Sequence, residues 1–347
     1  MESNLPSATV VIPVYRDVES VLRCLDAVLH QETERCLETI VVDDGSNDSA
    51  VAIVENWIAD HAGPQRIVRI LAQDHAGPAA ARNRGAKEAN GPILLFTDAD
   101  CEPRPDWVEK MLAPFEDAAV QGVKGTYETR QTSWVARLVQ VEYEEKYIRM
   151  EQFDSIDFID TYSAGFRRDI FLDLGGFDEG FPTASVEDQE FSFRMAERGY
   201  RMVFVPDARV VHRHAETLSE YIRKKFRIAY YKSYLLVRHP GRIQGDTHTP
   251  PTLIAQIPLS YGFWGFLAAT VFWSPSWLFC ILFAAADLAC MSGTLRLCRE
   301  RAPDLTARVP ILLAARSLAL GAGLISGTIR FRIGRRGAAP DRSTEES

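Results

Sequence analysis

The stretch ETIVVDDGS, residues 38–46, joins an apolar run to an acidic turn. The run from Glu38 to Val42 predicts a short buried strand, and Asp43 and Asp44 bring it to an end. Comparable apolar runs occur in the first hundred residues at 8–14, 66–71 and 93–96. Helical patterns separate these runs, at 21–29, 51–58 and 79–89.

Strands that alternate with helices over short connections indicate an α/β domain, with a mainly parallel sheet covered on both faces. Ligands bind such a sheet at the carboxyl ends of its strands. The pairs Asp43/Asp44 and Asp98/Asp100 each follow an apolar run, so we expect them to converge on one crevice. The chain has neither a GxGxxG pattern after the first run nor a GxxxxGK[ST] pattern, which argues against a dinucleotide dehydrogenase and a P-loop nucleoside triphosphatase.

Composition indicates which kinds of partner the protein binds and in which cellular compartment it lies. Acidic residues (47) outnumber basic ones (39), for a formal net charge of -8, which argues against a general affinity for nucleic acid. The six cysteines form no CxxC pair, and we expect reduced, mostly buried thiols. No basic residue precedes Arg16, and the apolar run at 10–12 is too short for a secretory signal. We therefore expect the catalytic part to stay in the cytoplasm.

The last third of the chain differs in character. No Asp, Glu, Lys or Arg lies between Asp246 and Asp287, which is room for two membrane-spanning helices. We predict a transmembrane hairpin over 251–292 that turns at the tryptophan-flanked segment 273–277. Basic clusters on both sides of it favour cytoplasmic ends and attachment to the inner membrane. A buried helical hairpin in a soluble protein is the alternative.

Three further segments accompany this hairpin. Residues 216–250 interleave aromatic and basic side chains, which predicts an interfacial helix on anionic lipid. Within residues 293–336, the stretch 305–329 is apolar but includes Arg308 and Arg316. A span there would place the basic end outside, so we expect a helix that lies in the interface. The polar tail at 337–347 is expected to be disordered.

The spacing of Asp98 and Asp100 predicts a site that binds a divalent metal together with a sugar phosphate. Side chains two positions apart at a strand end project to the same side. One carboxylate can then bind Mn²⁺ or Mg²⁺, which also bridges phosphates, while the other contacts a ribose or a sugar. An isolated Asp-x-Asp pair is just as often a solvated turn.

The surrounding motifs resemble those of glycosyltransferase family 2. In order and spacing the match extends over roughly residues 8–215, through VVIPVY (10–15), VVDDGSND (41–48), ARNRG (81–85) and TDAD (97–100). The resemblance implies a GT-A fold over residues 1–215, inverting chemistry and a nucleotide-sugar donor, usually a UDP-sugar. It also implies that Pro13, Tyr15 and Asp44 line the nucleotide pocket, that Asp98 faces the ribose and sugar, and that Asp100 binds the metal.

Arg82 is predicted to contact the diphosphate, since a guanidinium pairs well with phosphate oxygens; a helix-surface charge is the alternative. The likeness continues at 163–168 and 175–178, which implies a donor-sugar pocket that includes Gly165. It then leads to an acidic acceptor motif at Glu187 and Asp188. We predict Asp188 as the general base, with Glu187 second; favourable charges at a helix N-terminus are the alternative.

His212 follows a strand at 202–205 and is implied as a further metal ligand, with His214 as a competitor and a structural histidine as the alternative. The Gln-x-x-Arg-Trp motif of processive relatives is absent from 221–227, which favours transfer of a single sugar. Together with the interfacial helix this predicts a lipid-linked or polysaccharide-precursor acceptor. The competing functions are a nucleotidyltransferase, which no glycine-rich, lysine-containing loop supports, and a silent membrane scaffold, which the retained acidic positions disfavour.

Overall fold

The computed structural model describes residues 5–46, 50–63, 66–181, 185–241 and 246–334. Asn47 and Asp48 of the second motif and the predicted tail at 337–347 lie outside these ranges. The chain divides into two compact units, which are described separately. The first lies within Met1–Arg130 and Phe153–Arg213, and the second within Gln131–Gln152 and His214–Ala338.

The first unit is built on an eight-stranded sheet of order β3-β2-β1-β4-β7-β6-β8-β5. The β3-β2-β1-β4 half is parallel, as is the β6/β8 pair, whereas β7 runs antiparallel to both neighbours and β5 antiparallel to β8. The strands are β1 (Ala8–Val14), β2 (Leu37–Asp43), β3 (Arg66–Ala72), β4 (Ile93–Phe96), β5 (Glu102–Pro103), β6 (Val120–Glu128), β7 (Ala164–Arg167) and β8 (Arg201–Val211).

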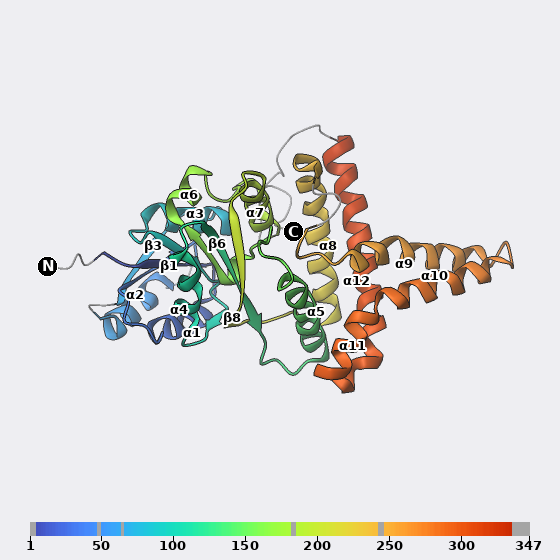
Figure 1. Ribbon diagram of the computed structural model, residues 1–347, viewed down its shortest axis with the longest axis horizontal. Coiled ribbons are helices and arrows are strands. Elements are labelled where there is room, and N and C mark those ends of the chain that lie inside the picture. Colours follow the sequence, from blue (N-terminus) through green and yellow to red (C-terminus); the bar gives the residue numbers. More distant parts are fainter. Residues whose placement is uncertain (1–4, 47–49, 64–65, 182–184, 242–245, 335–347) are drawn as a thin grey trace. The chain divides into compact units, whose positions relative to one another are not determined.

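Helices accompany this sheet through the first unit (Figure 1). They are α1 (Val18–Leu29), α2 (Ala50–His61), α3 (Pro78–Glu88), α4 (Trp107–Leu112), α6 (Arg168–Asp173) and α7 (Glu187–Glu197), with 3-10 turns at Ala113–Glu116 and Thr161–Ser163. The predicted α/β class and mainly parallel sheet are confirmed. Strands β1, β2 and β4 are the fully or almost fully buried ones, which explains their unbroken apolar runs.

Gly85 is where α3 approaches the sheet most closely. A Cβ at this position would overlap Val11 Cγ1 and come within 3.2 Å of Val42 Cγ2. We expect Gly85→Ala to lower the free energy of unfolding by up to about 2 kcal/mol, since overpacking costs about 1–3 kcal/mol and the helix propensity of alanine returns about 1 kcal/mol. Denaturant unfolding measures this loss. Gly63→Ala is the control because its Cβ meets nothing within 4 Å, and equal stabilities of the two variants would contradict the expectation.

The second unit is helical. Its helices are α5 (Trp134–Met150), α8 (Leu218–Arg238), α9 (Pro251–Ala269), α10 (Ser276–Cys290), α11 (Ser292–Arg301) and α12 (Val309–Thr328), with a 3-10 turn at Pro303–Arg308 and a π-helical end at Ile329–Gly334. Helix α12 packs along α8, and α9 pairs with α10 (Figure 1). Helix α5 packs against α11 and α12, so residues 131–152 group with this unit although they lie within the range predicted for the first domain.

Among the described residues, the apolar helices are long enough to cross a membrane. Helix α9 and the segment Pro303–Phe331 are each long and apolar enough to span a membrane. Helices α10 and α11, bent by 50° relative to each other, are so only when taken together as one span. The predicted hairpin corresponds to α9 and α10, whose connecting turn exposes Phe272 at 94%. The segment predicted to lie in the interface is therefore also apolar enough to be a span. Two to three apolar helices suggest membrane association.

A buried polar cluster joins the helices of the second unit. Glu142 on α5 accepts hydrogen bonds from the Tyr221 hydroxyl (2.8 Å) and from the Arg316 guanidinium (2.5 Å). Arg316 also donates to Gln256 on α9, and Lys225 Nζ lies 3.6 Å from Glu142. Burial by itself raises the pKa of Glu142, but Lys225, Arg316 and Lys146 lower it to about 2. Helices α5, α8 and α12 thus share one buried carboxylate, and α9 joins the cluster through the bond from Arg316 to Gln256.

Candidate active site

The carboxyl ends of β1, β2 and β4 bring the predicted residues to one edge of the sheet. The amide of Asp44 donates to the carbonyl of Val14 (2.9 Å), which ties the ends of β1 and β2 together. Tyr15 follows β1 and stacks on His75, with ring centroids 4.2 Å apart. Its side chain is 40% exposed. An exposed aromatic pair beside acidic residues is a surface on which a nucleotide base can stack.

Asp44 shapes the loop that leads into α3. Its two carboxylate oxygens accept hydrogen bonds from the amides of Ala76 and Gly77, both at 2.9 Å, and from the Gln73 side chain (2.7 Å). Asp44 is buried, so these bonds replace the water that a carboxylate needs. Its visible role is to position this loop, and its contact with a nucleotide stays a prediction.

Arg82 is buried between two carboxylates. Its guanidinium donates to Asp98 at 2.6 Å and to Glu187 at 3.1 Å. Burial alone would lower the pKa of Arg82, but the two carboxylates raise it, so the side chain remains a cation. The alternative of a helix-surface charge is therefore wrong. Arg82 instead connects the end of β4 to the start of α7, and its contact with a diphosphate stays a prediction.

Glu187 and Asp188 begin α7 but have different surroundings. Glu187 is buried and pairs with Arg82, and it accepts from the amide of Ser185 (2.8 Å). Asp188 is partly exposed and accepts from the amide of Gln189 (2.7 Å). Burial, Glu187 and Asp160 raise the pKa of Asp188 well above its usual value, against the lowering effect of Arg82. A carboxylate that holds a proton more readily is suited to act as a general base.

The structure adds a buried lysine that the sequence reading missed. Lys124 on β6 is fully buried, and its ammonium pairs with Asp160 and donates to the Tyr162 hydroxyl (3.0 Å). Burial lowers the pKa of Lys124, and Asp160 opposes that shift. Because Asp160 also raises the pKa of Asp188, this pair contributes to the electrostatics of α7. The available signal was a lysine inside the otherwise uncharged strand segment VQGVKGTY.

Asp100 and His212 lie together, as a shared metal site requires. His212 Nδ1 is 3.4 Å from Asp100 Oδ2. The Sγ atom of Cys101 joins them, and single ligand atoms of the three residues lie within 4.8 Å of one another. Oxygen, nitrogen and sulfur donors at this spacing fit a divalent cation. The predicted competitor His214 instead stacks on Tyr143 in the second unit and contacts Gln140 Oε1 through Nε2 (2.9 Å).

Two predicted residues lie within the sheet. Pro13 is on β1 opposite Val42 of β2 and is half-buried. Gly165 is buried on β7, where a Cβ would come within 3.1 Å of Phe115 and 3.2 Å of Leu95. The visible role of Gly165 is close packing, and its place in a sugar pocket stays a prediction.

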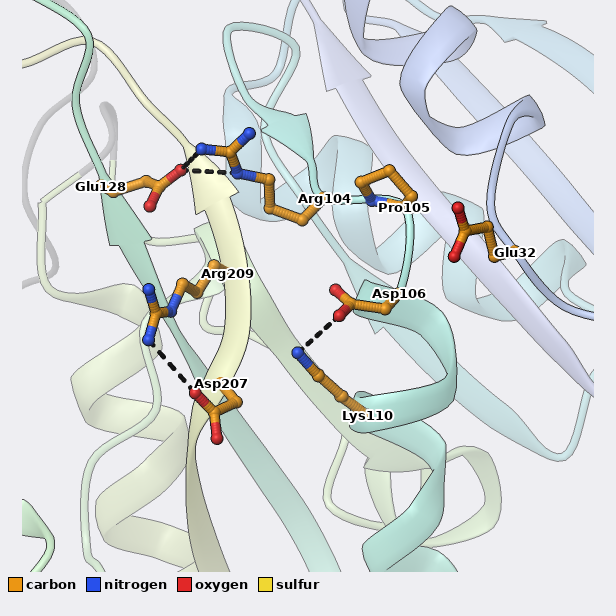
Figure 2. Close-up of a pocket in the computed structure, with 8 residues that line it drawn as sticks. All are labelled: Glu32, Arg104, Pro105, Asp106, Lys110, Glu128, Asp207 and Arg209. Atoms are coloured by element: carbon orange, nitrogen blue, oxygen red, sulfur yellow. Dashed lines mark hydrogen bonds and ion pairs between the residues drawn. The ribbon is translucent and has the colours of Figure 1, made fainter.

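A separate pocket of about 430 Å³ lies beside β8 and the start of α4 (Figure 2). None of the predicted site residues lines it. Its charges pair with one another: Arg104 with Glu128 (2.6 Å), Lys110 with Asp106 (2.6 Å) and Arg209 with Asp207 (3.2 Å) (Figure 2). A pocket whose cations are already neutralised is a weaker phosphate site than the edge with the metal-ligand cluster.

Two family models match the chain. The model described as Glycosyl transferase family 2 matches residues 9–175, and the one described as Glycosyl transferase family group 2 matches residues 93–292. The second match covers more than half of the chain.

Curated relatives share about 30% identity. Glycosyltransferase AglE of Haloferax volcanii is 29% identical over 66% of this chain and 73% of its own length. An N-acetylglucosaminyltransferase of Rhizobium sp. (strain N33) is 30% identical over 65% of the chain, and the pre-mycofactocin glycosyltransferase of Mycobacterium tuberculosis is 29% identical over 73%. The chain spans about half the length of these last two relatives, 52% and 53%.

Among solved structures, the mannosyltransferase PcManGT from Pyrobaculum calidifontis, in complex with GDP-Man and Mn²⁺, aligns with a TM-score of 0.58. It is 21% identical to this chain, and the alignment covers 94% of this chain and 87% of the other. That likeness concerns the fold.

Proposed function

Because the chain belongs to glycosyltransferase family 2 and has the GT-A fold, we propose that it is an inverting, non-processive enzyme that uses a UDP-sugar and a lipid-linked acceptor. Family membership makes it a nucleotide-sugar-dependent glycosyltransferase and decides against the nucleotidyltransferase alternative. One observation carries the proposed site. Asp98 and Asp100 follow β4 at one edge of the sheet, where Arg82 donates to both Asp98 and Glu187 and where His212 lies 3.4 Å from Asp100.

Each side chain at this edge has a distinct proposed task. Asp100 and His212 would hold Mn²⁺ or Mg²⁺, which neutralises the leaving diphosphate. Asp98, held by Arg82, faces the ribose and the sugar, and Tyr15 with His75 offers the stacking surface for the base. Asp188 takes the proton from the acceptor hydroxyl as that oxygen attacks from the face opposite the diphosphate, so a single base suffices.

The second unit supports a lipid-linked acceptor at the cytoplasmic face of the inner membrane. Helix α8 exposes cations together with apolar side chains, a composition suited to anionic headgroups: Ile222, Arg223, Lys224, Phe226 and Arg227. The apolar helices α9 and α10 of the same unit would anchor it as a multi-pass protein. An enzyme held at the lipid surface meets a polyprenyl-linked acceptor by diffusion in two dimensions.

Donor turnover by the full-length chain in nanodiscs tests the proposal. UDP-, GDP- and dTDP-sugars are each supplied with Mn²⁺, Mg²⁺ or EDTA, with and without polyprenyl-phosphate acceptors. We expect release of UDP from one donor only with metal, and we expect Asp100→Ala to weaken metal-dependent donor binding by about 10-fold or more because it removes a ligand. Asp106→Ala, an acidic residue of the Figure 2 pocket, is the control. Metal-independent turnover, or transfer to soluble acceptors at the same rate, would contradict the proposal.

A further inference from the structure

Cys101 lies beside the two proposed metal ligands. Its Sγ atom is 3.7 Å from His212 Nδ1 and 4.0 Å from Asp100 Oδ1. His212 Nδ1 is in turn 3.4 Å from Asp100 Oδ2. These distances involve both carboxylate oxygens of Asp100. With one ligand atom counted for each residue, the three atoms form a triangle whose members all lie within 4.8 Å of one another.

Strand pairing creates this triangle. Glu102 of β5 lies opposite Val211 of β8 in an antiparallel register. Cys101, which precedes β5, and His212, which follows β8, are therefore the next pair of facing residues. On its other side His212 is tied to β6, because its amide donates to the carbonyl of Glu128 (2.9 Å). The His212 ring is further packed by Tyr127, with centroids 5.1 Å apart. The backbone therefore holds Cys101 and His212 opposite each other without requiring a bound ion.

The spacing agrees with that of atoms around one cation. At zinc bond lengths of about 2.3 Å to sulfur and about 2.0–2.2 Å to nitrogen and oxygen, tetrahedral neighbours are about 3.4–3.6 Å apart. The sulfur–nitrogen and nitrogen–oxygen distances of 3.7 and 3.4 Å lie within about 0.2 Å of these values. The sulfur–oxygen distance of 4.0 Å is somewhat longer and is to Oδ1, the Asp100 oxygen other than the one that lies 3.4 Å from His212.

We propose that Cys101 is a third protein ligand of the divalent cation, as a thiolate, together with Asp100 and His212. The inference rests on the proposed function, because it places this residue in the metal centre of the donor site. Binding transfers the thiol proton to solvent and forms a metal–sulfur bond, with no change of oxidation state. A sulfur ligand shifts the preference of the site from Mg²⁺ toward Mn²⁺, Co²⁺ and Zn²⁺.

Cys24 provides a matched control. It is also fully buried, and its Sγ lies 3.5 Å from the carbonyl oxygen of Asp98, so it borders the same motif. It is nevertheless not a member of the ligand triangle. A serine at position 24 or 101 changes one buried thiol into a hydroxyl of similar shape, so the two variants differ mainly in whether the thiol faces the cation.

Cobalt spectroscopy on the full-length chain in detergent tests the proposal without any turnover. Co²⁺ is titrated with and without UDP, and we expect a near-ultraviolet thiolate-to-cobalt charge-transfer band in the wild type and in Cys24→Ser. Cys101→Ser should lose the band and about 10-fold or more of the Co²⁺ affinity, while its Mg²⁺ affinity changes by less than about 3-fold, because a hard cation gains little from sulfur. Circular dichroism confirms that each variant is folded.

The outcomes distinguish a failure of the Cys101 ligand role from a failure of the proposed metal centre. A Co²⁺ complex that forms in the wild type, weakens in Asp100→Ala and shows no charge-transfer band overturns the role of Cys101 but leaves the metal-dependent function intact. A band that persists in Cys101→Ser and disappears in Cys24→Ser also overturns it. If Co²⁺ fails to bind the wild type with or without UDP, both this inference and the proposed metal centre fail.

Discussion

Asp188→Asn is expected to lower turnover by about 10²- to 10⁴-fold, the usual contribution of a general base, while donor binding stays within about 3-fold of the wild type. Asparagine keeps the size of the side chain and the acceptor oxygen for the Gln189 amide. It cannot accept the proton of the attacking hydroxyl. Single-turnover transfer and equilibrium binding of the donor, measured on the same preparation, separate the two effects.

The wild-type pH dependence provides a second readout of the same residue. The pKa of Asp188 lies well above the usual aspartate value, because burial, Glu187 and Asp160 disfavour the charged form. The active carboxylate is therefore present above that raised pKa, and turnover should fall as the pH drops through it. In Asp188→Asn the residual rate should lose this acid limb.

Glu190→Gln is the matched control for Asp188→Asn. It neutralises another carboxylate of α7, one that pairs with Arg194 in the same helix (2.8 Å). It should reduce stability but leave the turnover of the folded protein near that of the wild type. A rate in Asp188→Asn above a tenth of the wild-type rate, or an equal loss in Glu190→Gln, would remove Asp188 from the role of base.

Residues that follow apolar runs were predictable from the sequence. The runs before Asp44 and Asp98 are continuous because both faces of those strands are buried, and parallel pairing then brings their ends to one edge. The alternation of strands with helices follows from the local pattern, and the position of the acidic pairs at the carboxyl ends of parallel strands follows from general topology.

The contacts that the sequence pattern does not indicate are those between residues far apart in the chain. Cys101 faces His212 only because the two-residue strand β5 pairs with β8, and such a short strand leaves no periodic signal. Lys124 gives no hint of its partner Asp160, which lies 36 residues further on. Likewise, nothing in the local pattern of α5 indicates that Glu142 pairs with Arg316, 174 residues away, so the helix was assigned to the first domain.

The buried Glu142–Arg316 pair leads to a second prediction, a large loss of stability when its carboxylate is removed. Glu142→Gln should lower the free energy of unfolding of the second unit by about 3–5 kcal/mol, the usual cost of removing one partner from a buried ion pair. Glutamine keeps the shape, but it leaves the buried Lys225 and Arg316 without their shared carboxylate. Denaturant unfolding in detergent, followed by tryptophan fluorescence and circular dichroism, measures the loss.

Glu144→Gln, two residues away on α5, controls for the loss of a negative charge. Glu144 lies 3.7 Å from Arg301, which is largely exposed, and such pairs contribute about 0–1 kcal/mol. If both variants lost the same free energy, or if Glu142→Gln unfolded within about 1 kcal/mol of the wild type, the buried cluster would have no special part in holding these helices together.

The sign of the pH effect follows from the same carboxylate. The pKa of Glu142 is about 2 in the folded protein and 4.5 for an ordinary glutamate, so the unfolded state binds the proton more readily. The stabilisation is complete above about pH 4.5 and disappears as the pH falls toward 2, and a shift of this size corresponds to roughly 3 kcal/mol. The Glu142→Gln variant should therefore lose less stability than the wild type over that acid range, because it has no carboxylate left to protonate.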